Sequence, residues 1–160
     1  MRKLIAIAAG VLSLLAAPAT SGAADSNAQR WLVLTRPGTP TEVVATGTVT
    51  ARGTVQDFLT LNPGGTFDNI AVQHFPDGDL FYHAQGTWTI ALNPLTCIGE
   101  VDVTGPFVIT GGTGAYEGAT GEGVALIDLR LFFEKTDTGC GFIPTRIYGL
   151  AHAEGTLDLP

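Results

Sequence analysis

Six side chains could bind a small molecule, because each places a polar or charged group among apolar neighbours in a segment with strand character. They are Asp57, Tyr82, Asp128, Arg130, Arg146 and Tyr148. Asp57 alternates with apolar residues in 55–61, and a carboxylate on such a face is costly to bury unpaired, so we expect its pKa to be raised. Tyr82 shares an apolar face, where a buried hydroxyl needs a partner. The alternatives are an exposed aspartate near a turn and a tyrosine that only packs in the core.

The other four candidates lie on strand faces that alternate with apolar or small residues. Asp128 and Arg130 share one face of 124–133, where they could pair, and the opposite face is entirely apolar. Arg146 and Tyr148 likewise lie opposite a face of small residues that suits a narrow barrel interior. This pattern favours the exterior for all four, as a solvent-facing salt bridge and a charged outer face. With the faces reversed, they would anchor a polar ligand group inside a cavity.

Other common chemistries are disfavoured by residue type and spacing. Ser26 is the last serine in the chain, so a serine nucleophile in the folded region is excluded. His74 and His83 are weak candidates for a general base on strand positions. The acidic residues lack the spacing of a calcium loop, and no third or fourth ligand accompanies the two cysteines at zinc spacing. We therefore expect no metal and no cofactor.

The elements that must position these side chains are short β-strands. Val- and Thr-rich runs alternate with turn signals such as Arg36–Pro40, Asn62–Gly65 and Pro76–Asp79, and none shows the spacing of an amphipathic helix. The predicted strands are 31–34, 42–52, 55–61, 66–75, 80–92, 98–104, 107–110, 124–133 and 146–159. Eight or nine strands at such regular spacing predict an all-β sandwich or barrel, and a closed barrel leaves no long edge strands.

The first residues have the parts of a secretory signal peptide. Arg2 and Lys3 precede an apolar run that is too short to span a bilayer comfortably, and small residues up to Ala24 offer a cleavage site. We predict a signal peptide at 1–24 and one domain at 25–160, in an extracellular or periplasmic protein. Cleavage would leave 6 of the 8 basic residues against 15 acidic ones, a formal charge of −9. That charge argues against nucleic-acid partners and against stable membrane insertion.

Cys97 and Cys140 are the only cysteines, so one pairing is available. An exported chain matures where disulfides persist. Closing this loop would stabilise the fold by about 4 kcal/mol on the chain-entropy estimate. The alternative is two separate thiols.

Six glycines lie within the fifteen residues of 109–123. A dinucleotide-binding loop needs its third glycine one residue earlier and a helix after it, whereas a strand-like run follows here. A phosphate-binding P-loop needs a lysine, and the segment has none. The remaining interpretation is structural: a bulged, twisted hairpin or barrel corner, where glycine allows positive φ and close chain approach. Its structural positions are Gly111, Gly112, Gly114, Gly118 and Gly121.

Residues 108–121 resemble the glycine signature shared by plant dirigent proteins, allene oxide cyclases and bacterial proteins of the same barrel-like superfamily. In that signature, Gly-Gly-Thr-Gly is followed by an aromatic residue and then Gly-Ala-x-Gly, as in Gly111–Gly121. The resemblance implies an antiparallel eight-stranded barrel with an axial pocket, often trimeric in the plant members. The cyclases fold a reactive fatty-acid epoxide for cyclisation, and dirigent proteins orient phenoxy radicals for coupling.

Two functions follow from this reading. In the first, the barrel binds a small hydrophobic molecule and steers its cyclisation or coupling by conformational restriction, as a cofactor-independent isomerase. In the second, it is a non-catalytic secreted module that binds a ligand or protein or has a structural role.

Overall fold

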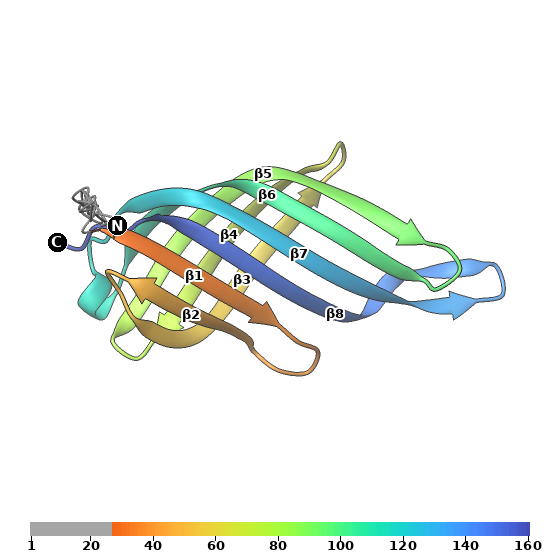
Figure 1. The fold of residues 1–160 in the computed structure, drawn as a ribbon, viewed down its shortest axis with the longest axis horizontal. Coiled ribbons are helices and arrows are strands. Elements are labelled where there is room, and N and C mark those ends of the chain that lie inside the picture. The colour runs from red at the N-terminus through yellow and green to blue at the C-terminus, as the bar shows by residue number, and fades with distance from the viewer. Residues whose placement is uncertain (1–26) are drawn as a thin grey trace, which may run out of the picture.

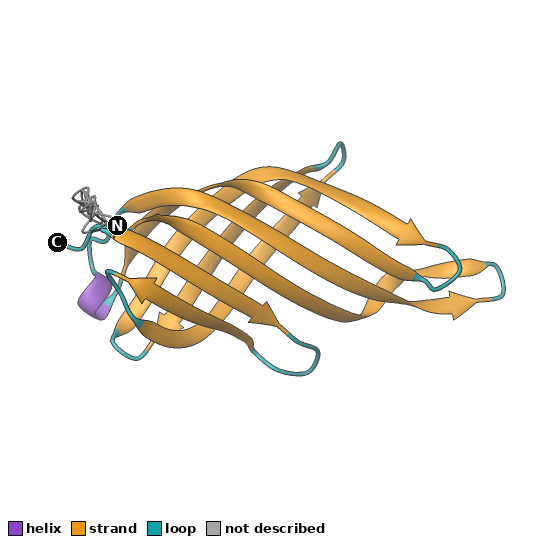
Figure 2. Cartoon of the chain, in the orientation of Figure 1, coloured by secondary structure: helices purple, strands orange, loops and turns teal. Residues whose placement is uncertain are grey.

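The computed structural model describes residues 27–160, so the predicted signal peptide at 1–24 lies outside the described part. Eight antiparallel strands close into a single barrel, in which each strand pairs with the next and β8 pairs with β1 (Figure 1, Figure 2). This confirms the predicted all-β barrel. The strands are β1 (Ala28–Thr35), β2 (Thr41–Gly47), β3 (Ala51–Asn62), β4 (Thr66–Phe75), β5 (Gly78–Asn93), β6 (Ile98–Gly112), β7 (Gly121–Thr136) and β8 (Gly139–Thr156). No helix within residues 27–160 is long and apolar enough to cross a membrane.

Several predicted strand boundaries differ from the structure, including the start of β8, which lies at Gly139 instead of 146. The predicted strand 42–52 is divided by a turn at 48–50, and Gly53, predicted as a break or bulge, lies inside β3. A side chain at Gly53 would collide with the backbone oxygen of His74, so this glycine allows close packing of β3 on β4. The segments 98–104 and 107–110 form one continuous strand, β6. Gly105 and Pro106 of β6 have no paired residues on β5, which is consistent with the proline having no N–H to donate.

The glycine segment forms the connection between β6 and β7 at one end of the barrel. It contains the short 3-10 turn η1 (Gly114–Tyr116), and it buries Tyr116 and Ala119 in the core. The Tyr116 ring packs edge-on against Phe75, with 5.9 Å between ring centroids. Gly114 adopts a φ of 60°, and a side chain there would lie 2.4 Å from the Asp77 carbonyl oxygen. The segment is therefore part of the barrel's packed end.

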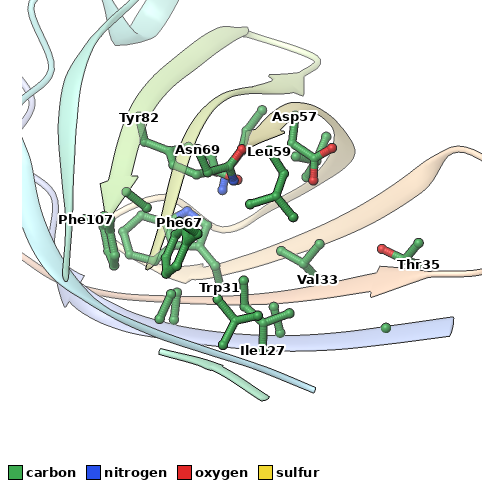
Figure 3. Close-up of a pocket in the computed structure, with 18 of the residues that line it drawn as sticks. Trp31, Val33, Thr35, Asp57, Leu59, Phe67, Asn69, Tyr82, Phe107 and Ile127 are labelled. Carbon is green, nitrogen blue, oxygen red and sulfur yellow. The ribbon is translucent and has the colours of Figure 1, made fainter. Parts of the chain in front are cut away.

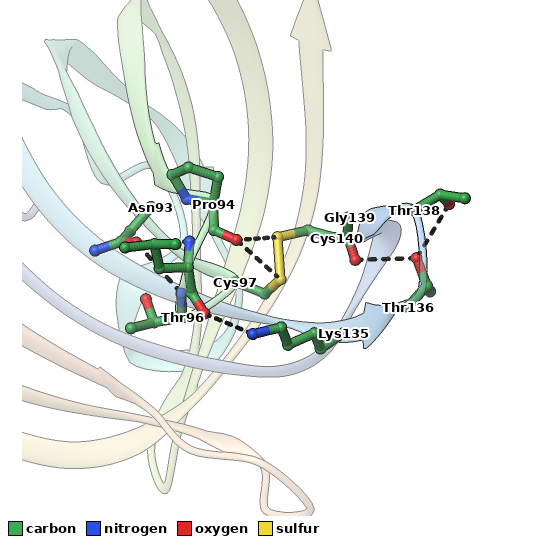
Figure 4. The surroundings of a disulfide bond; sticks show 10 residues. Asn93, Pro94, Thr96, Cys97, Lys135, Thr136, Thr138, Gly139 and Cys140 are labelled. Carbon is green, nitrogen blue, oxygen red and sulfur yellow. Dashed lines mark hydrogen bonds between the residues drawn. A yellow bond between two sulfur atoms is a disulfide. The ribbon is translucent and has the colours of Figure 1, made fainter.

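At the other end, β5 to β8 extend beyond β4 and β1, the strands that pair with β5 and β8 (Figure 1). Pairing of β4 with β5 begins at Thr66 and Thr87, while β5 continues to Asn93 beside β6. Pairing of β1 with β8 stops at Thr35 and Gly149, so residues 139–148 pair with β7 alone. We call the strand portions 88–93, 98–103, 129–136 and 139–148 the extension. The predicted Cys97–Cys140 disulfide joins its two hairpin tips, which confirms the pairing (Figure 4).

Candidate functional site

The barrel contains a cavity of about 110 Å³ with two different walls. The wall from β1, β7 and β8 is mainly apolar, and the wall from β3 to β5 carries polar side chains (Figure 3). The apolar wall includes Trp31, Val33, Ala125, Ile127, Leu129, Ala151 and Ala153. Aromatic rings narrow the cavity, with Trp31 edge-on to Phe107 at 5.4 Å between centroids. The interior is thus amphipathic across its width.

Four polar side chains surround one small residue on the β3–β5 wall. Ala71 of β4 is fully buried, and its register partners are Asp57 on β3 and Tyr82 on β5. Asn69 and Gln73 lie two residues to either side of Ala71 and therefore on the same face. We call Asp57, Asn69, Gln73 and Tyr82 the polar wall.

Three buried polar atoms at the cavity have no hydrogen-bond partner within residues 27–160. They are Asn69 Oδ1, Gln73 Oε1 and Trp31 Nε1. An unpartnered buried group costs about 1–3 kcal/mol, so such atoms in a native protein require an explanation. Sequence reasoning missed Asn69 and Gln73. Their signal was the alternation with Phe67, Ala71 and Phe75, the same pattern that singled out Asp57.

Burial shifts the proton affinity of the two predicted residues that face the cavity. Desolvation raises the pKa of Asp57, and a hydrogen bond from its own backbone opposes part of this rise. Desolvation raises the pKa of Tyr82 far above its usual range, and the negative charge of Asp57 raises it further. Asp57 keeps contact with solvent, which screens its charge. Tyr82 is therefore a neutral phenol at any physiological pH.

The structure brings Asp57 and Tyr82 together and separates them from the other four candidates. Residues Ala125, Ile127 and Leu129 line the cavity, so the alternating Asp128 and Arg130 point outward. The nearest acid to Arg130 is Glu100 on β6, with an N–O distance of 3.5 Å, and the suggested pairing with Asp128 is not formed.

The outward position also holds for the last two candidates. The Arg146 guanidinium lies over the Phe132 ring at 5.5 Å, and Tyr148 packs edge-on to the same ring. Phe132 alternates with the inward-facing Leu129 and Leu131, so this cluster is on the outer surface. A ligand role for Arg146 and Tyr148 would therefore have to be outside the cavity.

No family model, curated protein or solved structure matches this chain. The resemblance of the glycine segment therefore stays a prediction. A fold alone does not specify a function, so the site is interpreted from its own chemistry.

The raised pKa of Asp57 predicts a pH-dependent effect of Asp57→Asn. The folded state holds this proton more tightly than the unfolded chain, so wild-type stability falls as pH rises above the ordinary aspartate pKa and through the raised one. The Asp57→Asn variant has no carboxyl group at this position, so it does not lose stability in this way as the pH rises. We expect its melting temperature to exceed that of wild type at pH 7, and the difference to disappear near pH 3. Glu122→Gln, an acid-to-amide change on the outer face of β7, is the control. A gain of equal size at both positions would contradict the assignment to the cavity.

Proposed function

We propose that the barrel binds a small, mainly hydrophobic molecule in its cavity and holds it in one conformation, so that its cyclisation or coupling follows one steric course. The cavity carries this proposal: it is about 110 Å³ in volume, and apolar side chains form most of its lining. An engineered apolar cavity of about 150 Å³ in another protein accepts benzene. A molecule built around a single ring is the matching size. The glycine segment's resemblance to cyclases and dirigent proteins supports the same reading.

The residues in the cavity suit catalysis by orientation. The rings of Trp31, Phe67 and Phe107 restrict where a flat or folded ligand can lie, and the polar wall fixes which edge faces β4. Holding a reactive molecule near its productive geometry can supply several kcal/mol of the activation barrier. This mode of action uses no cofactor.

Filling the cavity tests the proposal. Ala151 lines the cavity and pairs with Val33 and Ile127, so Ala151→Leu would occupy ligand space. His152→Leu adds a leucine to the outer face of the same strand and is the matched control. We expect toluene to bind wild type and the control equally, as measured by ligand-observed NMR. Its affinity for Ala151→Leu should be at least tenfold lower, which corresponds to a loss of about 1.4 kcal/mol in binding free energy. Equal binding to all three proteins, each shown to be folded by its melting temperature, would remove the cavity as the binding site.

We also propose that the protein is exported to an extracellular or periplasmic compartment. The Cys97–Cys140 disulfide supports this location, because structural disulfides persist in oxidising compartments. Export would use the predicted signal peptide at 1–24. The homotrimer implied by the resemblance stays a prediction.

One observation favours a second candidate function, that of a non-catalytic binding module. Three large apolar side chains at the tips of the extension's two hairpins are largely exposed: Leu95, in the turn between β5 and β6, at 78%, and Phe142 and Ile143, on β8, at 99% and 80%. Exposed apolar clusters mark interaction sites. If the protein bound neither toluene nor any comparable ring compound, a non-catalytic binding module would be the better description of its function.

A further inference from the structure

We infer that the cavity selects a neutral molecule whose apolar ring bears a hydrogen-bond donor such as a hydroxyl group, and that it rejects carboxylates and phosphates. The inference rests on the proposed binding function and specifies the ligand of the same cavity. The unpartnered polar atoms and the distribution of charge around the cavity carry it.

The polar wall offers acceptors that lack donors. Asn69 and Gln73 are only 6% and 5% exposed, and their side-chain oxygens have no partner in the described part of the chain. They lie four residues apart on one face of β4, which separates them by about 13 Å, so a single hydroxyl group can reach only one of them. A carboxylate or phosphate without a proton can only accept hydrogen bonds, so it leaves both oxygens unsatisfied. A hydroxyl group can donate to either oxygen.

The apolar wall offers one donor that lacks an acceptor. The Trp31 indole N–H is buried, with the residue only 3% exposed, and its nitrogen has no partner within residues 27–160. A hydroxyl oxygen accepts as well as donates. Hydroxyl groups are therefore complementary to both kinds of unpartnered atom in this cavity, whereas a hydrocarbon satisfies neither.

The charge around the cavity argues against an anionic ligand. Among the described residues that line it, Asp57 is the only acid and none is lysine, arginine or histidine. The basic side chains of the neighbouring strands, such as Arg52 and Arg130, point outward. Burying a negative charge beside the Asp57 carboxylate with no compensating cation is strongly unfavourable. An alcohol avoids that cost.

Three single-ring probes of similar size separate these properties: toluene, benzyl alcohol and benzoate. The protein has two tryptophans, so ¹⁵N-labelled protein gives two indole N–H signals. Trp88 Nε1 already donates to the Thr66 carbonyl at 3.0 Å, so its signal is an internal reference. We expect benzyl alcohol to shift the Trp31 signal alone and to bind about tenfold more tightly than toluene, the upper range for one good hydrogen bond. Benzoate should not bind at pH 7.

Variants of the polar wall test the assigned acceptors. Gln73→Leu and Asn69→Leu each remove one of the two acceptors. The variant that removes the oxygen bound by the hydroxyl group should reduce the preference for benzyl alcohol over toluene towards unity, while toluene affinity is retained. The wild-type preference in both variants would overturn the assignment of the acceptors. Gln56→Leu, on the outer face of β3, should keep the wild-type preference. Two results with the wild-type protein would overturn the inference and leave the proposed function intact. In the first, toluene binds as tightly as benzyl alcohol; in the second, benzoate binds more tightly than either. Binding of none of the three would overturn both.

Discussion

Replacing Cys97 and Cys140 together with serine is expected to lower the free energy of unfolding by about 4 kcal/mol. The bridge closes a loop with a sequence separation of 43, and its removal restores conformational freedom to the unfolded chain. In the folded state it ties the tips of the two hairpins of the extension, where β5 and β8 each have only one neighbouring strand. For a domain of this size, the melting temperature should fall on the order of 15 °C. Urea unfolding followed by circular dichroism measures the change.

The matched control replaces two exposed threonines with serine: Thr96, which precedes Cys97, and Thr138, which lies two residues before Cys140. These surface changes should stay within about 0.5 kcal/mol of wild type. A loss below about 1 kcal/mol in the cysteine double variant would contradict the prediction, because the bridge would then contribute little beyond the strand pairing. Two titratable thiols in the protein purified without a reducing agent would refute the bridge itself.

Gly112→Ala is expected to destabilise the barrel by about 3 kcal/mol, at the upper end of overpacking effects. A Cβ atom at this position would lie 2.5 Å from the carbonyl oxygens of both Asp79 and Tyr116. Neither carbonyl can move freely, because Asp79 O accepts the Thr113 N–H and Tyr116 O accepts the Ala119 N–H. Relieving the collision would therefore break backbone hydrogen bonds at the packed end of the barrel.

Gly141→Ala provides the comparison for Gly112→Ala. Gly141 lies in β8, and the nearest atom to an added Cβ would be 3.5 Å away, an ordinary contact. Both substitutions restrict the unfolded chain equally, so their difference isolates the folded state. Chemical unfolding should show a clear loss only at position 112. Equal stability of the two variants would show that the β6–β7 connection relaxes without cost.

Strand alternation predicted which side chains face inward. In 124–133 the uniformly apolar face lines the cavity, and Asp57 and Tyr82 point inward as their apolar neighbours indicated. The alternation could not show that these two residues flank Ala71. That arrangement depends on the register of β3, β4 and β5, which the turns between them set.

The pairing of Arg130 shows where sequence reasoning failed. Asp128 is two residues away on the same strand face, a separation of about 7 Å along the strand. Glu100 is the register partner of Arg130 on β6, so its side chain starts much closer. Asn69 and Gln73 were missed for a related reason: nothing within β4 alone shows whether a buried amide finds a partner on a neighbouring strand.

The closure of the barrel by β1 and β8 links the formation of the cavity to the completion of folding. All other strand pairs are hairpins between successive strands, which form from local contacts, whereas β1 and β8 join the two ends of the domain. The apolar wall takes Val33 from the first strand and Ala151 from the last. A chain without its final strand therefore lacks part of the cavity lining as well. During synthesis, the cavity can assemble only after the last residues of β8 have emerged.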